Sequence, residues 1–260
     1  MAQKIPANAK KTIERLAILG SILFVIGLLM TVRDWKLGSA LAKETHINIK
    51  PVKGKTYIVA EDIKKIIRDS TGQDIENIVL GNLNIRSIEE KLKSNPFVFD
   101  AEVYIDARNH IYIEVEQNEP ILRIIAETGN YYISKSGQKI PQSKRDVARV
   151  PVATGKIPKY RTGYWLSSVN DLTTLYKVAN YIHQDDFLRP LIEQIDMGDY
   201  GSLTLVPKLG HHNIEFGNDE RLEEKFRYLK IFYKEALPQH GWEKYKTISL
   251  KYRGQVVGVK

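Results

Sequence analysis

Residues able to perform chemistry are few and scattered in this chain. It contains no cysteine, and its histidines are His46, His110, His183, His211, His212 and His240. The lack of cysteine excludes thiolate metal sites, a cysteine nucleophile and disulfides. No two histidines have the H-x-x-x-H spacing that places both on one helix face, and adjacent residues of a strand point to opposite sides. We therefore expect no metal site.

Catalytic motifs are also missing from the sequence. Asp185-Asp186 precedes Phe187 and is typical of a helix cap or a solvated loop, not of a paired general acid and base. The sequence lacks a nucleophile elbow, a Walker A loop and the glycine pattern of dinucleotide sites. We expect no catalytic residue, no cofactor and no small-molecule substrate.

The charge distribution argues against a nucleic-acid partner. The net charge is +8, and half of it comes from residues 1–36, which hold six basic and two acidic side chains. The remaining residues hold 33 basic and 29 acidic side chains, which is a mixed surface without a dense basic cluster.

An uncharged apolar run extends from Leu16 to Val32. As a helix it would be about 25 Å long, against about 30 Å for the hydrocarbon core of a membrane. Basic residues are in excess on its amino side, which predicts that residues 1–15 stay in the cytoplasm. We thus expect a membrane span at 16–32, a linker at 33–43, and export of the rest.

A cleaved signal peptide is the alternative reading of this segment. Ala40-Leu41-Ala42 offers a cleavage site of the A-x-A type. Against cleavage, the apolar run is longer than the usual 7 to 15 residues, and the charged stretch Arg33–Lys36 separates it from that site. A retained span is the favoured interpretation.

A β-hairpin with one apolar face is predicted between Asn95 and Pro120. Its two runs alternate apolar and polar residues. The residues expected on the apolar face are Phe99, Ala101, Val103, Ile105, Ile111, Ile113 and Val115. An isolated hairpin is marginal in water, so another element must cover this face.

The segments upstream of the hairpin can supply that cover. His46–Lys50 alternates like a strand, and 60–70 has isoleucines at helical spacing. Asn84 can cap a second helix over 85–94, which ends at Asn95-Pro96 because a residue before proline avoids the α region. The predicted order is strand, helix, helix, strand, strand, an α+β sandwich.

The second half predicts a mixed α/β layer. Strands are expected at 121–126, 131–134, 192–196, 202–206 and 213–216. Helices are expected at 170–183 and, after a cap at Asn218, at 219–236. Thr247–Val259 is predicted to be a last strand with a free outer edge, which would invite strand addition by a partner. The alternative is an ordinary strand that only closes the sheet.

Several motifs in order carry a resemblance to a known family. Pro96-x-Val98-x-x-Ala101-x-Val103 and Ile111-x-Ile113-x-Val115 with Pro120 resemble the POTRA domain of the FtsQ/DivIB family of bacterial cell-division proteins. The second half is similar at three further places. These are Tyr132-Ile133-Ser134 with Gly137, Pro151–Gly155, and Ile248–Tyr252 followed by Gly254 and Val256-Val257. The likeness covers about residues 10 to 259.

The resemblance implies an architecture and a function. It implies a POTRA domain at 44–119, a β domain at 120–260, and a non-catalytic scaffold held at the division septum by one helix in the inner membrane. The implied partners are proteins similar to FtsB and FtsL at the β domain, and to FtsK at the POTRA domain. The implied docking residues on the last strand are Lys251, Tyr252, Arg253, Gly254, Val256, Val257, Gly258 and Val259.

Two other function classes stay open at this level. One is a POTRA protein of outer-membrane assembly or secretion. Proteins of that class resemble chains with a long carboxy-terminal β-barrel, whereas this chain has two predicted helices in the part that follows the POTRA unit. The other is a membrane-anchored periplasmic enzyme, which would need a catalytic constellation that the motifs do not supply.

Overall fold

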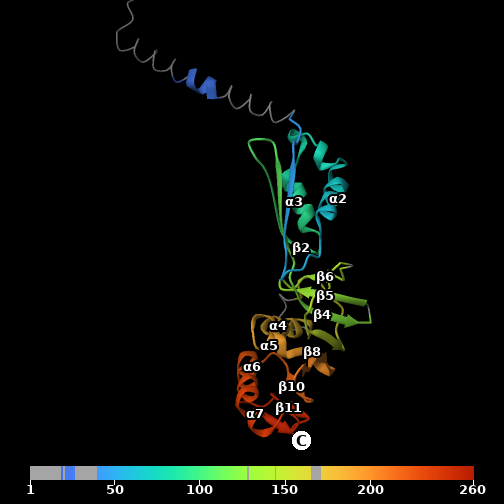
Figure 1. Ribbon diagram of the computed structural model, residues 1–260, viewed down its shortest axis with the longest axis vertical. Coiled ribbons are helices and arrows are strands. Elements are labelled where there is room, and N and C mark those ends of the chain that lie inside the picture. The colour runs from blue at the N-terminus through green and yellow to red at the C-terminus, as the bar shows by residue number, and fades with distance from the viewer. Residues whose placement is uncertain (1–18, 20, 27–39, 128, 144, 165–170) are drawn as a thin grey trace, which may run out of the picture. The chain divides into compact units, whose positions relative to one another are not determined.

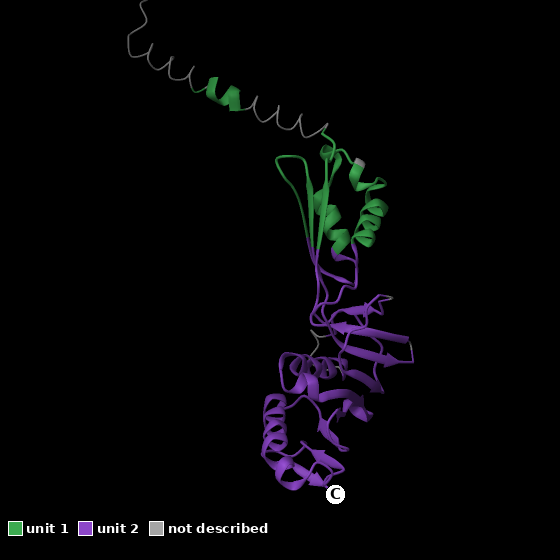
Figure 2. Ribbon diagram, in the orientation of Figure 1, with its two compact units in different colours: residues 1–48, 60–92, 102–114 green, residues 49–59, 93–101, 115–260 purple. Residues whose placement is uncertain are grey.

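The computed structural model describes Leu19 and residues 21–26, 40–127, 129–143, 145–164 and 171–260. The chain divides into two units, which Figure 2 colours separately. The first unit comprises residues 1–48, 60–92 and 102–114, and the second comprises 49–59, 93–101 and 115–260.

The expected membrane span, Leu16–Val32, lies mostly outside the described residues. Leu19 and the stretch 21–26 are the parts of it that are described, and they are helical and exposed. Within the described ranges, no helix combines the length and the apolar character needed to cross a membrane. The expected tail at 1–15 also lies outside the described residues, as does most of the expected linker at 33–43.

A three-stranded sheet with two helices follows the predicted order. The strands are β1 (Thr45–Lys50), β2 (Val98–Ile105) and β3 (Ile111–Gln117), arranged β1-β3-β2. Between β1 and β2 the chain forms α2 (Ala60–Thr71), η1 (Ile75–Asn77), η2 (Leu80–Asn82) and α3 (Ile85–Lys93) (Figure 1). Asn84 caps α3 as predicted, because its Oδ1 accepts the main-chain N–H of Ser87 at 3.0 Å.

Helices α2 and α3 cover the apolar face of the hairpin, as the sequence analysis requires. The apolar residues of α2 and α3 that become buried are Ile63, Ile67, Ile88 and Leu92. Val103 of β2, and Ile111 and Ile113 of β3, are buried as well. The carboxylate of Glu89 on α3 accepts the N–H of Val103 at 2.8 Å, so α3 lies directly against β2. Burying each large apolar side chain contributes about 1.5 to 3 kcal/mol.

The prediction for Phe99 was wrong. Phe99 is 55% exposed, while Val98 is buried, so the alternation shifts by one residue before Ala101. Polar contacts on both sides of the shift account for it. Asp100 faces out to pair with Lys93 at 2.7 Å, and the side-chain amide of Asn118 donates to the carbonyl of Val98 at 3.0 Å.

The second unit holds a nine-stranded mixed sheet. In chain order its strands are β4 (Pro120–Ala126), β5 (Gly129–Ser134), β6 (Lys139–Pro141), β7 (Val152–Gly155), β8 (Ile192–Met197), β9 (Leu203–Pro207), β10 (Asn213–Gly217), β11 (Thr247–Ser249) and β12 (Val257–Val259). The spatial order is β12-β11-β10-β9-β8-β7-β4-β5-β6. The pairs β4–β7, β7–β8 and β10–β11 are parallel, and the other neighbours are antiparallel. The five expected strands between 121 and 216 are present to within two residues.

Helices pack on this sheet around one core. They are α4 (Asp171–Gln184), α5 (Leu188–Leu191), α6 (Leu222–Ile231) and α7 (Leu237–His240), with a π-helical segment η5 (Phe232–Ala236) joining α6 to α7. The fully buried core residues include Leu175 and Val178 of α4, Ile195 and Leu205 of the sheet, and Phe226 of α6.

The predicted start of the helix expected at 219–236 was wrong. The helix begins at Leu222, because Arg221 takes a left-handed backbone conformation with φ 53° that an α-helix cannot contain. Asn218 does not cap it. Its Oδ1 accepts the N–H of Glu220 at 3.2 Å and forms a local turn instead.

The single last strand expected over Thr247–Val259 is also a wrong prediction. The segment forms two short antiparallel strands, β11 and β12, separated by a turn. Gly254 in that turn has φ 73°, a left-handed conformation that glycine adopts without steric cost. This turn reverses the chain and moves Val257–Val259 to the edge of the sheet.

Candidate partner-binding edge

Strand β12 is an edge strand. It pairs with β11 through Thr247–Val259, Ile248–Gly258 and Ser249–Val257, and β11 in turn pairs with β10. On its other side β12 has no strand neighbour in the part of the chain that the structure describes. Main-chain groups along such an edge can pair with an incoming strand. The sequence therefore predicted the segment that forms the edge, but not the hairpin that places it there.

The turn before β12 is fixed to the start of α6. The guanidinium of Arg221 donates to the carbonyl of Lys251 at 3.1 Å, and the N–H of Gly254 donates to Glu224 at 3.4 Å. Arg221 also pairs with Glu224 at 3.2 Å. These contacts hold the turn while leaving the Tyr252 side chain 55% exposed. Tyr252 and Arg253, two of the expected docking residues, are thus displayed on an anchored turn.

The edge strand itself is built around Gly258. A β-carbon at this position would lie 2.4 Å from Cδ1 of Tyr245, so only glycine lets the strand lie this close to the tyrosine ring. On either side, Val257 is half-buried and Val259 is 52% exposed. The middle residue of the strand, Gly258, is therefore held against Tyr245, and the neighbouring Val259 exposes apolar surface.

A hollow of about 310 Å³ reaches Val256, the residue before the edge strand. Its lining residues are Tyr228, Ile231, Phe232, Glu235, Ala236, Gln239, His240 and Val256. Most of them belong to α6 and the π-helical segment after it. Pro238 lacks the N–H that would continue an α-helical ladder, and the π-helical segment ends two residues before it. Ile231 in this hollow is 45% exposed.

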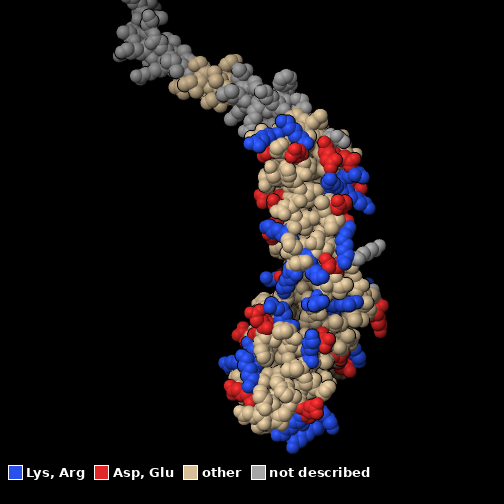
Figure 3. Space-filling view, in the orientation of Figure 1, with Lys and Arg blue, Asp and Glu red and all other residues tan. Residues whose placement is uncertain are grey.

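The segment that ends in the edge strand is basic. The segment 244–260 contains no acidic residue, and its basic residues are Lys244, Lys246, Lys251, Arg253 and Lys260. Figure 3 shows Lys and Arg side chains gathered at this end of the second unit. Lys251 is paired with Glu215 at 3.1 Å. The surface is suited to a partner that carries acidic groups next to its strand.

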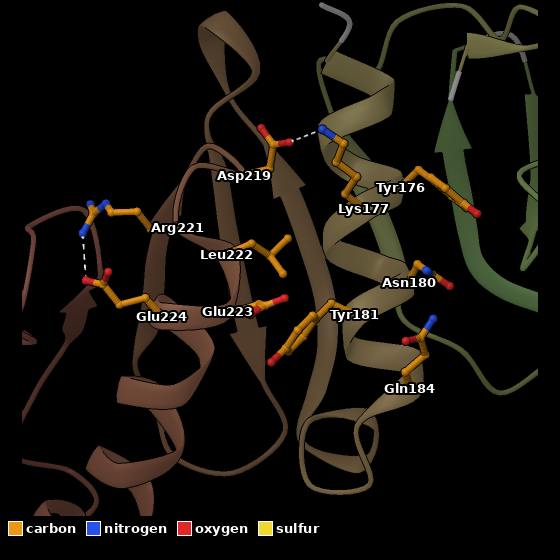
Figure 4. Close-up of a pocket in the computed structure, with 10 residues that line it drawn as sticks. All are labelled: Tyr176, Lys177, Asn180, Tyr181, Gln184, Asp219, Arg221, Leu222, Glu223 and Glu224. Atoms are coloured by element: carbon orange, nitrogen blue, oxygen red, sulfur yellow. Dashed lines mark hydrogen bonds and ion pairs between the residues drawn. The ribbon is translucent and has the colours of Figure 1, made fainter. Parts of the chain in front are cut away.

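A groove of about 620 Å³ lies between α4 and α6 (Figure 4). It is lined by Tyr176, Lys177, Asn180, Tyr181, Gln184, Asp219, Arg221, Leu222, Glu223 and Glu224. Lys177 pairs with Asp219 at 2.7 Å, as the dashed line in Figure 4 marks. Hydrogen bonds from Lys177 and Thr174 keep the pKa of Asp219 below its usual range, although burial acts to raise it.

Residues in the wall of this groove hold the edge strand in place. Its wall residues Arg221 and Glu224 are the same two side chains that hold the turn before β12. Tyr181 on the facing helix stacks on Phe226 of α6 at 4.9 Å. Because these partners are far apart in the sequence, sequence reasoning missed them.

Two of the histidines are buried and hydrogen-bonded. Nε2 of His183 lies 3.0 Å from Glu119, which also pairs with Lys53 at 3.0 Å. Nε2 of His212 lies 2.6 Å from the hydroxyl of Tyr233. Burial lowers the pKa of both imidazoles, so each contributes to packing as a neutral ring near pH 7.

Asp185 caps the start of α5, which is one of the two roles expected for it. Its Oδ1 accepts the main-chain N–H groups of Phe187 and Leu188 at 2.9 and 3.0 Å. Its Oδ2 pairs with Lys230 at 2.6 Å. Burial acts to raise the pKa of Asp185, but these contacts outweigh it and hold the pKa low. A carboxylate kept ionised in this way is suited to structure and not to proton transfer.

Comparison with known families assigns both halves of the chain. A family model described as FtsQ/DivIB, C-terminal related, matches residues 119–259, which is more than half of the chain. A second model, described as a POTRA-like domain, matches residues 40–116. A search of curated proteins gave no match.

Proposed function

Since the chain belongs to the FtsQ/DivIB family, whose members are non-catalytic scaffolds of bacterial cell division, we propose that it captures a membrane-anchored division protein through β12. The observation that carries this proposal is the position of β12 at the end of the nine-stranded sheet. The proposed docking residues are Lys251, Tyr252, Arg253, Gly254 and Val256 to Val259.

Capture works by extension of the sheet. An extended segment of the partner pairs with the outer side of β12, and main-chain hydrogen bonds supply much of the affinity. Apolar side chains next to that segment fill the hollow lined by Ile231, Phe232 and Val256. Acidic side chains of the partner meet Arg253 and Lys260. Proteins similar to FtsB and FtsL are the proposed partners.

The POTRA-like domain supplies a second contact in this proposal. It is matched over residues 40–116 and has its own buried core. A protein similar to FtsK is the proposed ligand of this domain. The scaffold would then connect one division protein at its POTRA-like domain with others at its β domain, without a chemical step.

The proposed anchor is a retained inner-membrane helix at 16–32, with residues 1–15 in the cytoplasm and the domains after 43 in the periplasm. The support is the uncharged run and the basic excess on its amino side. Reporter fusions after Lys10 and after Lys260 should behave as cytoplasmic and exported, respectively. A mature protein beginning at Lys43 would contradict this topology, since it would show cleavage after Ala42.

The division role is tested in the native cells. A fluorescent fusion of the full chain should concentrate at the septum, and depletion of the protein should produce undivided filaments. A variant lacking residues 253–260 should remain in the membrane without restoring division. Normal cell length after depletion would contradict a role in division.

A further inference from the structure

Three side chains on the first unit bring metal-binding atoms together. Glu44, His46 and His110 each offer a ligand atom, and these atoms lie within 4.8 Å of one another. Glu44 and His46 are two residues apart in extended chain, so both point to the same side. His110 comes from the opposite direction, at the end of the β2–β3 turn. No motif spacing could reveal this group, because the hairpin brings its members together.

Main-chain bonds fix the two segments that carry these side chains. The N–H of Ile111 donates to the carbonyl of Glu44 at 2.9 Å, and the N–H of Lys43 donates to the carbonyl of Asn109 at 3.0 Å. The His46 ring also stacks on Tyr112 with 4.8 Å between centroids. The relative position of the three donors is therefore set by the backbone and by one ring contact.

Asp106 orients the His110 imidazole. Its Oδ2 lies 3.2 Å from Nδ1 of His110, and its Oδ1 accepts the main-chain N–H groups of Arg108 and His110 at 2.8 and 2.9 Å. When Nδ1–H donates to this carboxylate, Nε2 is the nitrogen open to a ligand. Metal-bound histidines in proteins commonly have such a carboxylate behind them.

We propose that Glu44, His46 and His110 form a surface site for a divalent transition-metal ion of the zinc class. Oε2 of Glu44 lies 3.4 Å from Nε2 of His46. Zinc bonds to nitrogen and oxygen are about 2.0 to 2.2 Å, which in tetrahedral geometry separates two ligand atoms by about 3.3 to 3.5 Å. That pair is already spaced for zinc, and water completes the fourth position.

The donor set also selects the ion. Two imidazoles and one carboxylate suit zinc and its neighbours, whereas magnesium and calcium prefer shells of oxygen ligands. The bound ion ties the start of β1 to the β2–β3 turn. Because the unfolded chain does not hold these donors together, binding stabilises the folded first unit.

The test measures zinc binding to the full-length protein, without an affinity tag, in detergent at neutral pH. Competition with a chromophoric chelator should show one site, which excess Mg²⁺ does not block. His46→Ala and His110→Ala should each weaken it at least tenfold, and Asp106→Asn should weaken it about tenfold by releasing the His110 ring. His211→Ala is the matched control, because His211 is exposed and lies 4.0 Å from Glu243 in the second unit.

Thermal unfolding gives the second readout. Zinc should raise the unfolding midpoint of the wild type and of His211→Ala, but not that of His46→Ala or His110→Ala. Each midpoint is compared with that of the same variant without zinc, and without zinc His46→Ala should unfold close to the wild type, since the His46 side chain is 48% exposed. Equal zinc affinity in the wild type and both histidine variants would overturn the site, as would an equal loss in His211→Ala.

Discussion

Val103→Asp is expected to unfold the POTRA-like domain. Val103 is 4% exposed and belongs to the apolar face that α2 and α3 cover. A carboxylate there is buried without a cation, and the carboxylate of Glu89 already lies at the N–H of this residue. We expect a cost of several kcal/mol, a large part of the roughly 5 to 15 kcal/mol that stabilises a typical domain. Hydrogen exchange of the full chain, followed by mass spectrometry, measures this loss of stability.

Peptides from β2, β3, α2 and α3 should lose protection in this variant, whereas peptides from α4 and β8 should keep it. The hydrophobic core of the second unit consists of residues between Ile121 and Leu250, and Val103 is not part of it. Tyr104→Asp is the matched control, because Tyr104 is the next residue and is 43% exposed. Wild-type protection in Val103→Asp would mean that Val103 is not a core residue.

Strong periodicity explains which parts of the fold could be predicted. Apolar residues recur over at least two turns in each of the helices at 60–71 and 85–93, and they alternate along both strands of the hairpin. The structure has all of these elements near the predicted bounds. Strands β6 and β7, with three and four residues, are too short to show an alternation. Phe99 was misplaced because the shift at Val98 depends on Asn118, a partner from a distant segment.

The candidate site could be predicted only in part, for a similar reason. The family likeness indicated the segment from Lys251 to Val259. Its shape depends on one backbone conformation, that of Gly254, and on contacts with Arg221 and Glu224 that no local pattern encodes. The hollow beside the edge is lined by side chains of α6, η5 and α7 together with Val256, and no local pattern brings these together.

Val257→Pro is expected to abolish partner capture. Val257 is half-buried in β12 and pairs with Ser249. Proline removes its N–H and fixes φ, which disrupts a three-residue strand and with it the template for an incoming strand. The core on the inner side of β11 should stay folded, since Ile248 and Leu250 remain buried by β10 and the helices. Co-purification of the full chain with its native membrane partners measures capture.

Val257→Thr is the control for this substitution. Threonine is β-branched and keeps the main-chain N–H, so β12 should persist and capture should stay near the wild-type yield. The unfolding midpoints of both variants show whether the second unit is intact. Wild-type capture by Val257→Pro would exclude β12 as the docking strand and direct attention to the groove between α4 and α6.

The central claim is that a partner docks on one particular edge of the nine-stranded sheet, and site-specific photocrosslinking in the native cells tests it most directly. A photoreactive amino acid is placed at Val259 on β12, and in a second strain at Lys139 on β6, the exposed strand at the opposite end of the sheet. The account predicts a strong adduct with a membrane-anchored division protein from position 259 and none from position 139. An adduct from position 139 together with none from position 259 would contradict it.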